Sequence, residues 1–86
     1  MAKLKVYAAE WCPHCRRTVA WLTEQKIDFD YIDMDTIDAA TEALVTQANG
    51  GDDWVVPTLE HDGRWRHGQF FNEDKLAADL AAWGIY

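Results

Sequence analysis

The amino-acid sequence predicts an α/β domain in which a four-stranded mixed sheet is flanked by three helices, in the order βαβαββα. Three observations predict this class. Two extended stretches enclose a stretch with helical spacing, which is the pattern of a β-α-β unit with parallel strands. A second helical stretch follows, and an Asp-Gly turn then separates two further extended stretches. With a last helical stretch at the end, we expect helices on both faces of the sheet.

Periodicity defines the elements in the first half of the chain. Apolar residues alternate with lysine and tyrosine over 3–8, which is the period of a strand, and recur at helical spacing from about 13 to 26. Residues 27–32 are rich in β-branched and aromatic side chains and predict a second strand. A helical stripe over 37–48 ends at 49–51, because Asn-Gly-Gly tolerates the left-handed conformation of a helix end.

Turn and capping signals define the second half. Residues 55–60 lead into a third strand, Asp62-Gly63 is a hairpin signal, and 64–66 is the predicted return strand. Asn72 is the predicted N-cap of a final helix over 73–83, with acidic residues in its first turn where the helix dipole favours them.

Size and charge limit the class of function. A chain of 86 residues with 49% apolar residues suffices for one domain over residues 1–86. A net charge of -7 argues against nucleic acid and anionic membranes as partners, and favours a monomer in solution. Lysines interrupt the apolar residues at the start of the chain, and no apolar run is long enough to span a membrane. We therefore expect a cytoplasmic protein in a reducing compartment.

The Cys-Pro-His-Cys stretch holds the two cysteines of the chain. In a reducing compartment such a pair indicates redox or metal chemistry rather than a structural disulfide. Pro13 suits the first position of a helix, so Cys12 falls at the N-cap. There the free amides of His14 and Cys15, together with the helix dipole, favour the thiolate of Cys12.

An asymmetry between the two cysteines predicts their roles. Cys15 lies one helical turn further in, where we expect it to be more buried. Cys12 would attack a disulfide to form a mixed disulfide, and Cys15 would then attack Cys12 and release the product. A protonated His14 would place a cation near the Cys12 thiolate, stabilise the reduced form and make the pair more oxidising.

Metal binding is the competing interpretation of the cysteines. A structural zinc site would need a second cysteine pair or suitably spaced histidines, which the sequence lacks, so no metal site within one chain is expected. A dimeric iron–sulfur module remains open, in which Cys12 from two chains and two small thiols hold the cluster. The absorption spectrum of the isolated protein would distinguish thiol exchange from cluster binding: a colourless monomer supports exchange, and a brown dimer supports the cluster.

These features resemble the glutaredoxin family, which has the thioredoxin fold. The resemblance rests on the strand ending at Ala8, the Trp-Cys-Pro-His-Cys stretch at 11–15 and the Val-Val-Pro-Thr stretch at 55–58. It covers the chain from about Leu4 to Leu80. It implies a thiol–disulfide oxidoreductase that acts on mixed disulfides or disulfide-bonded proteins. It also implies that no cofactor is bound, because the electrons travel as thiols.

The resemblance also implies a substrate-binding surface. It implies a cis bond before Pro57, in a turn beside the nucleophilic sulfur. The backbone of Val56 would then pair with the incoming thiol or peptide as a short added strand. By their family positions, Trp11, Pro13 and His14 belong to the same surface.

Two departures from the family bear on the choice of thiol. Glutathione-using members usually carry a lysine or arginine about three residues before the first cysteine, where this chain has Ala9 followed by Glu10. Many members also carry a Gly-Gly-x-Asp stretch that opens the last helix and binds the glutamyl end of glutathione. Of that stretch, this chain clearly keeps only Gly68. The chain is closest to the mycoredoxin-like subgroup, which shares its Trp-Cys, Asn-Gly-Gly and Val-Pro-Thr. The expected co-substrate is therefore mycothiol, a sugar conjugate without the carboxylates of glutathione, with glutathione as the alternative.

The source of electrons stays open at this point. A flavin-dependent reductase would act indirectly, by regenerating the small thiol, or directly on the protein. In the second case the protein would be a redoxin that is reduced by thioredoxin reductase and donates electrons to ribonucleotide reductase. Such redoxins also lack the residues that hold the carboxylates of glutathione. They usually carry a Trp-Ser-Gly-Phe stretch before the last helix, which residues 67–70 match in part.

Overall fold

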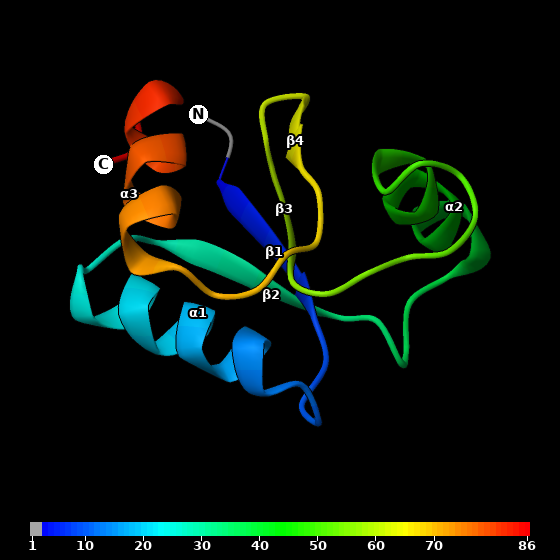
Figure 1. The fold of residues 1–86 in the computed structure, drawn as a ribbon. Helices are drawn as coiled ribbons and strands as arrows, with labels where there is room; N and C mark the ends of the chain where they lie inside the picture. The colour runs from blue at the N-terminus through cyan, green and yellow to red at the C-terminus, as the bar shows by residue number, and fades with distance from the viewer. Residues whose placement is uncertain (1–2) are drawn as a thin grey trace.

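Strand β1 (Leu4–Ala8) lies in the middle of the sheet. It pairs in parallel with β2 (Phe29–Asp33) and antiparallel with β3 (Thr58–His61), and β3 pairs antiparallel with β4 (Arg64–Arg66). The sheet order is therefore β2-β1-β3-β4 (Figure 1). The predicted four-stranded mixed sheet is confirmed.

This computed structural model describes residues 3–86. The prediction of one domain over 1–86 includes Met1 and Ala2, which lie outside the described residues.

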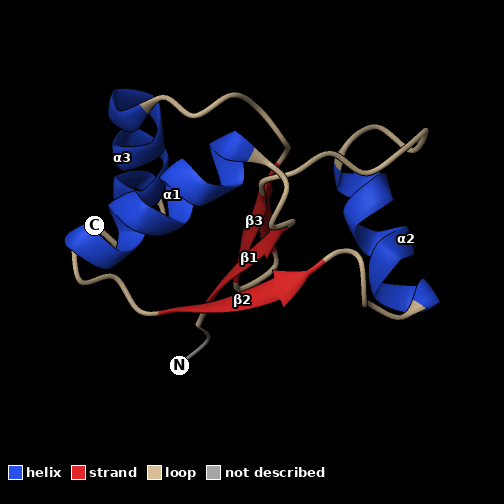
Figure 2. Cartoon of the chain, turned by 90° about the horizontal axis from the view of Figure 1, so that it is seen from below, coloured by secondary structure: helices blue, strands red, loops and turns tan. Residues whose placement is uncertain are grey.

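Three helices cover the two faces of the sheet, as the sequence predicts. Helices α1 (Pro13–Glu24) and α3 (Glu73–Ala82) lie on one face, and α2 (Ala39–Ala48) lies on the other (Figures 1 and 2). Within residues 3–86, the helices all fall short of the length and apolar character that crossing a bilayer demands.

Alternation along β1 divides the core between these two faces. Leu4, Val6 and Ala8 point to the α1 and α3 side and belong to the larger cluster of buried residues. Tyr7 points to the other side, where it is buried with Val45 of α2. This follows from the pleat of a strand, which sends successive side chains to opposite faces.

Several element boundaries differ from the prediction by a few residues; β2 begins at Phe29 rather than at 27, and α2 begins at Ala39 rather than at 37. Helix α1 ends at Glu24 rather than near 26, because Lys26 adopts a left-handed φ of 58° and Ile27 N–H turns back to bond the Leu22 carbonyl oxygen at 3.0 Å. Strand β3 begins at Thr58, after a proline that has no N–H to donate to the ladder.

The helix caps agree more closely with the sequence. Asn72 caps α3 as predicted, because its Oδ1 accepts from the Lys75 N–H at 2.9 Å. Asp38 caps α2 in the same manner, through a bond of 2.7 Å from the Thr41 N–H. A side-chain oxygen at this position satisfies an amide that the helix itself leaves without a partner.

The core packing predicts the effect of one leucine truncation. Leu80 of α3 is fully buried, so Leu80→Ala should lower the free energy of unfolding by roughly 2–5 kcal/mol through lost transfer energy and a residual cavity. Leu44→Ala is the matched control, because this helical leucine of α2 is 57% exposed and should change stability by under about 0.5 kcal/mol. Urea denaturation measures both. Equal losses for the two variants would contradict the described packing.

Candidate active site

Cys12 caps helix α1 with its sulfur. Its backbone is extended, with φ −93° and ψ 114°, and Pro13 occupies the first helical position as predicted. The Cys15 N–H donates to Cys12 Sγ at 3.2 Å. The expected second bond, from the His14 amide, is not among the hydrogen bonds of the described residues. The helix therefore begins with a donor aimed at the sulfur, where capping oxygens usually accept.

Cys15 is the more buried of the two thiols, as predicted. Cys12 is 6% exposed and Cys15 is 0% exposed, and both are free cysteines. Burial first, and then the hydrogen bond with Cys12, raise the pKa of the Cys15 thiol to about 12, while a backbone hydrogen bond from Ala9 acts in the opposite direction. Cys15 is therefore a protonated thiol at neutral pH, held against the sulfur of Cys12.

The turn before β3 approaches the same sulfur. Cys12 Sγ lies 3.8 Å from the carbonyl oxygen of Val56, toward which the thiol donates. The bond between Val56 and Pro57 is cis, as the family resemblance implies. The fold thus places the backbone of Val56, which is far from Cys12 in the sequence, directly beside the thiol.

Asn49 connects this turn to two other parts of the chain. Its Nδ2 donates to the Val45 carbonyl oxygen at 2.8 Å and to Thr58 Oγ1 at 3.0 Å, and its Oδ1 accepts from Gly68 N–H at 2.7 Å. The Thr58 hydroxyl in turn donates to the carbonyl oxygen of Val55. From the sequence, Asn49 is predicted only as the end of a helix, because nothing in the local pattern signals these distant partners.

His14 contacts the segment over 67–72 that joins β4 to α3. Its Nδ1 accepts from the Phe71 N–H at 3.1 Å, and its ring stacks on Phe70 with 4.8 Å between ring centroids. While Nδ1 accepts this bond it carries no proton, because a proton there would place two donors face to face. The cationic role predicted for His14 therefore requires the bond from Phe71 to break.

Exposed apolar side chains lie on the segments next to the thiol. Trp11 is 61% exposed, and its Nε1 donates to Asp35 Oδ2 at 3.1 Å. Phe70 is 80% exposed and Val55 is 45% exposed. The segment that carries Phe70 passes so close to Val55 that a Cβ on Gly68 would lie 2.4 Å from Val55 Cγ1, which explains the glycine.

The structure therefore brings the residues predicted for the site to one end of α1. They are Trp11, Cys12, Pro13, His14, Cys15, Val56 and Pro57. The sequence reasoning missed Asn49, Phe70 and Phe71. Among residues 3–86, no group of three or more His, Cys, Asp or Glu side chains is placed to hold a metal ion.

The fold and the cysteine pair together define a thioredoxin-fold thiol–disulfide oxidoreductase. The family model described as Glutaredoxin matches residues 4–65. The chain belongs to the glutaredoxin family, whose members act on disulfide substrates with a thiol reductant.

Individual relatives agree with this assignment. The chain is 36% identical over 61 residues to Mycoredoxin 1 of Corynebacterium glutamicum, a match that covers 71% of this chain and 72% of the relative. It superposes on the crystal structure of a glutaredoxin from Archaeoglobus fulgidus with a TM-score of 0.72 and 28% identity, over 91% of this chain and 85% of that one. Glutaredoxin 1 from Francisella tularensis gives a TM-score of 0.62 at 26% identity, over 95% and 98% of the two chains.

The raised pKa of Cys15 predicts how stability changes in alkali. The unfolded chain ionises this thiol near its ordinary pKa of 9.0, whereas the folded protein holds its pKa at about 12. The stability that Cys15 contributes is therefore complete below about pH 9 and is lost as the pH rises toward 12.

Urea denaturation of the wild type and of Cys15→Ala over this pH range checks the sign. The difference in unfolding free energy between them should shrink as the pH rises, because the wild type has a thiol at this position that ionises first in the unfolded chain, whereas the variant has none. A difference that stays constant with pH would show that burial does not hold this thiol neutral.

Proposed function

We propose that the protein reduces mixed disulfides and protein disulfides, with Cys12 as nucleophile and Cys15 as resolving thiol. The Cys12 thiolate attacks one sulfur of the substrate, and the other leaves as a thiolate that takes up a proton. Cys15 then loses its proton to solvent and attacks Cys12 Sγ, which releases the second product as a thiol. The protein is left with a Cys12–Cys15 disulfide, and two electrons have passed to the substrate.

The observation that carries this proposal is the N–H of Cys15 aimed at Cys12 Sγ at 3.2 Å. A donor at the positive end of a helix dipole favours a negatively charged sulfur, and the thiolate is the attacking species. The geometry thus supports Cys12 as the thiol that reacts first.

The pKa of Cys15 fits a thiol that acts second. Two of the causes that raise its pKa, the hydrogen bond and the charge interaction with Cys12, depend on Cys12 being free to accept or to ionise. Both weaken once Cys12 carries substrate in a mixed disulfide. The burial of Cys15 then remains as the cause that still raises its pKa. Cys15 is therefore expected to ionise more readily at the step where it must attack.

For substrate docking, we propose the surface that the sequence predicts. Val56 and Pro57 form the docking turn, which pairs with the substrate backbone. Trp11, Pro13 and His14 form the opposite border of the site. The contact of 3.8 Å between Cys12 Sγ and the Val56 carbonyl oxygen supports a substrate sulfur bound beside this turn.

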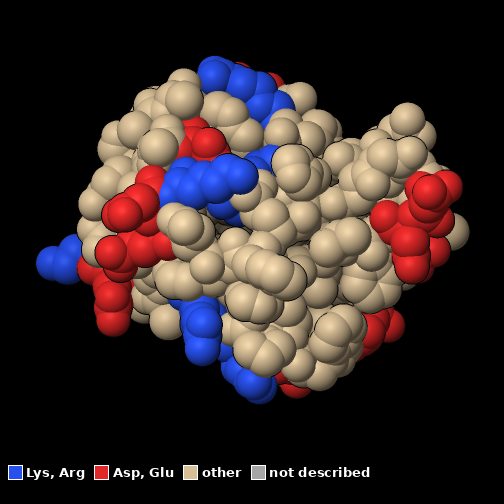
Figure 3. Space-filling model, viewed as in Figure 1, with Lys and Arg blue, Asp and Glu red and all other residues tan. Residues whose placement is uncertain are grey.

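As co-substrate we propose mycothiol rather than glutathione, in a monomeric protein working in the cytoplasm. Three observations support an uncharged sugar thiol. Mycoredoxin 1 is among the relatives. The middle of the face in Figure 3, over the uncharged segment 67–72, shows neither acidic nor basic side chains. Arg16, near the cysteines, donates its Nη1 to the Glu10 carbonyl oxygen at 3.1 Å rather than to the docking turn. A flavin-dependent reductase would regenerate the thiol.

The choice of thiol is tested by turnover of a mixed disulfide of 2-hydroxyethanethiol. With mycothiol and its reductase, kcat/KM should exceed the value with glutathione and glutathione reductase by about tenfold, which is about 1.4 kcal/mol of discrimination. Cys12→Ser is the inactive control. Turnover with glutathione that equals or exceeds turnover with mycothiol would remove the proposed thiol and leave the proposed reaction intact.

The resolving role of Cys15 is tested by trapping. Cys15→Ser should stop after the first attack and accumulate a covalent adduct of one substrate thiol on Cys12, seen by mass spectrometry of the intact protein. Cys12→Ser is the matched control, because it keeps one thiol of the pair and should form little adduct at neutral pH. Equal adduct in both variants, or none in Cys15→Ser, would assign the roles differently.

A further inference from the structure

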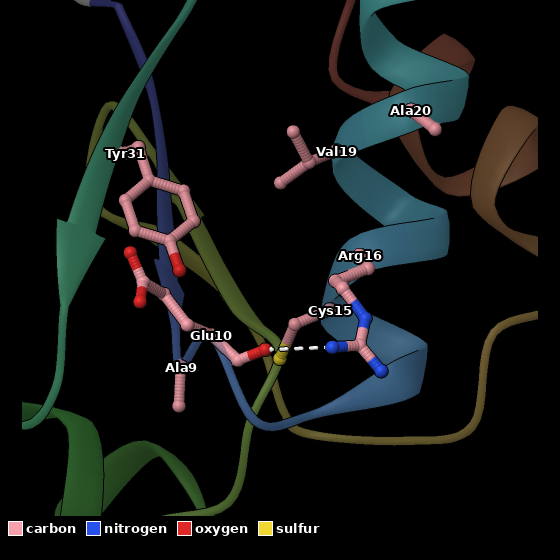
Figure 4. A pocket seen from close by; sticks show the side chains of 7 residues that line it. All are labelled: Ala9, Glu10, Cys15, Arg16, Val19, Ala20 and Tyr31. Atoms are coloured by element: carbon pink, nitrogen blue, oxygen red, sulfur yellow. Dashed lines mark hydrogen bonds between the residues drawn. The ribbon is translucent and has the colours of Figure 1, made fainter.

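A cavity lies between α1 and β2, on the side of the cysteine pair away from the docking turn. Its volume is about 460 Å³, which falls in the range of small-ligand sites. Figure 4 shows Tyr31 of β2 facing Val19 of α1 across this space, with Ala9 and the sulfur of Cys15 at one end. Its walls are thus largely apolar.

Negative charge gathers at the mouth of this cavity. The carboxylate of Glu10 lies beside the ring of Tyr31 (Figure 4). Burial first, and then the charges of Asp33, Glu10 and Asp35, raise the pKa of the Tyr31 phenol, and Cys15 adds to them only in alkali, where its thiol ionises. Because three carboxylates lie near enough to act on this ring, its side of the cavity favours a positively charged group.

The basic side chain that lines the cavity is Arg16, and it offsets part of this negative charge. Its guanidinium already donates to the backbone carbonyl oxygen of Glu10 at 3.1 Å. Against this one cation stand the carboxylate of Glu10, which lines the cavity, and those of Asp33 and Asp35, which act on Tyr31 from outside the lining, so negative charge remains in excess around this ring.

The cavity adjoins the sulfur that would hold a substrate. Cys15, at the end of the cavity, places its N–H 3.2 Å from Cys12 Sγ. The docking turn leads into β3 and the cavity borders β2, and these strands flank β1 on opposite sides. A peptide lying across the cysteine pair would therefore meet both. An extended residue spans roughly 3.3 Å, so the side chains that flank the reacting cysteine are the ones that would face this cavity.

We propose that this α1–β2 cavity binds the side chain of a lysine or arginine that flanks the reactive cysteine of a protein substrate. The inference rests on the proposed function. The aliphatic stem of such a side chain matches the apolar walls, and its charged end matches the face of Tyr31 and the carboxylate of Glu10. The chain would thereby select basic protein disulfides and disfavour acidic ones.

The test uses four peptides that differ only at the two positions flanking a single cysteine. These positions carry lysine, norleucine, alanine or glutamate, and the cysteine is a mixed disulfide with 2-thiopyridine. Cys12 attacks the peptide sulfur and pyridine-2-thione leaves. Cys15 then releases the peptide as a thiol, and the protein becomes the Cys12–Cys15 disulfide. Absorbance of pyridine-2-thione under single-turnover conditions gives each rate, divided by the rate of the same peptide with dithiothreitol.

The corrected rates should fall in the order lysine, norleucine, alanine, glutamate. Lysine should react roughly two- to fivefold faster than norleucine, as for an exposed ion pair, and this ratio should shrink as salt is added. The advantage of norleucine over alanine reports the apolar walls. The advantage of lysine over norleucine reports the acidic mouth.

Two variants locate the effect in the cavity. Glu10→Gln and Tyr31→Leu should each bring the ratio of lysine to norleucine closer to one. Asp62→Asn is the matched control, because it removes one negative charge at the tip of the β3–β4 hairpin. Asp62 has a φ of 53°, which asparagine also adopts, so the ratio should not change.

The outcomes separate this inference from the proposed function. Equal rates for all four peptides with the wild type would overturn the inference and leave the oxidoreductase function standing. Equal effects of Glu10→Gln and Asp62→Asn would assign the preference to net charge and would also overturn it. If the wild type reduces none of the peptides, the proposed function fails and the inference fails with it.

Discussion

The hydrogen bond from the Cys15 amide to the sulfur of Cys12 is the contact on which the proposed chemistry depends. It exists because Pro13 starts a helix at the residue after Cys12, so that the first free amides of α1 point back at the sulfur. The same helix geometry carries Cys15 into the core, where burial keeps it protonated. One local structure therefore makes two chemically identical side chains different.

The surroundings of this contact are assembled from segments far apart in the chain. Asn49 holds the end of α2, the start of β3 and the segment 67–72 through three hydrogen bonds. His14 ties the same segment to α1 through the Phe71 amide. The position of the docking turn relative to Cys12 thus depends on side-chain amide and imidazole groups as well as on the sheet.

The sequence predicts most of the fold, because periodicity and turn chemistry are local. Asn72 and the Asp-Gly hairpin lie where these rules place them. The contacts of Asn49 and Phe71 could not be predicted, because each joins residues that only the completed sheet brings together. The early end of α1 escaped prediction for a different reason: a lysine carries no signal for the left-handed φ that Lys26 adopts. The position of Cys12 at the start of α1 was predictable, because a proline in the next position is a local signal for the beginning of a helix.

The unequal division of the core has a consequence for local unfolding. The face under α1 and α3 holds the larger hydrophobic cluster, whereas the buried residues of the hydrophobic cluster on the α2 face are Tyr7, Met34 and Val45. Elements with less buried apolar contact open at lower free energy, so amide protons of α2 should exchange with solvent faster than those of α1. Because Asn49 ends α2, each such opening would also free the docking turn, and the α2 layer would then control how rigidly a substrate is held.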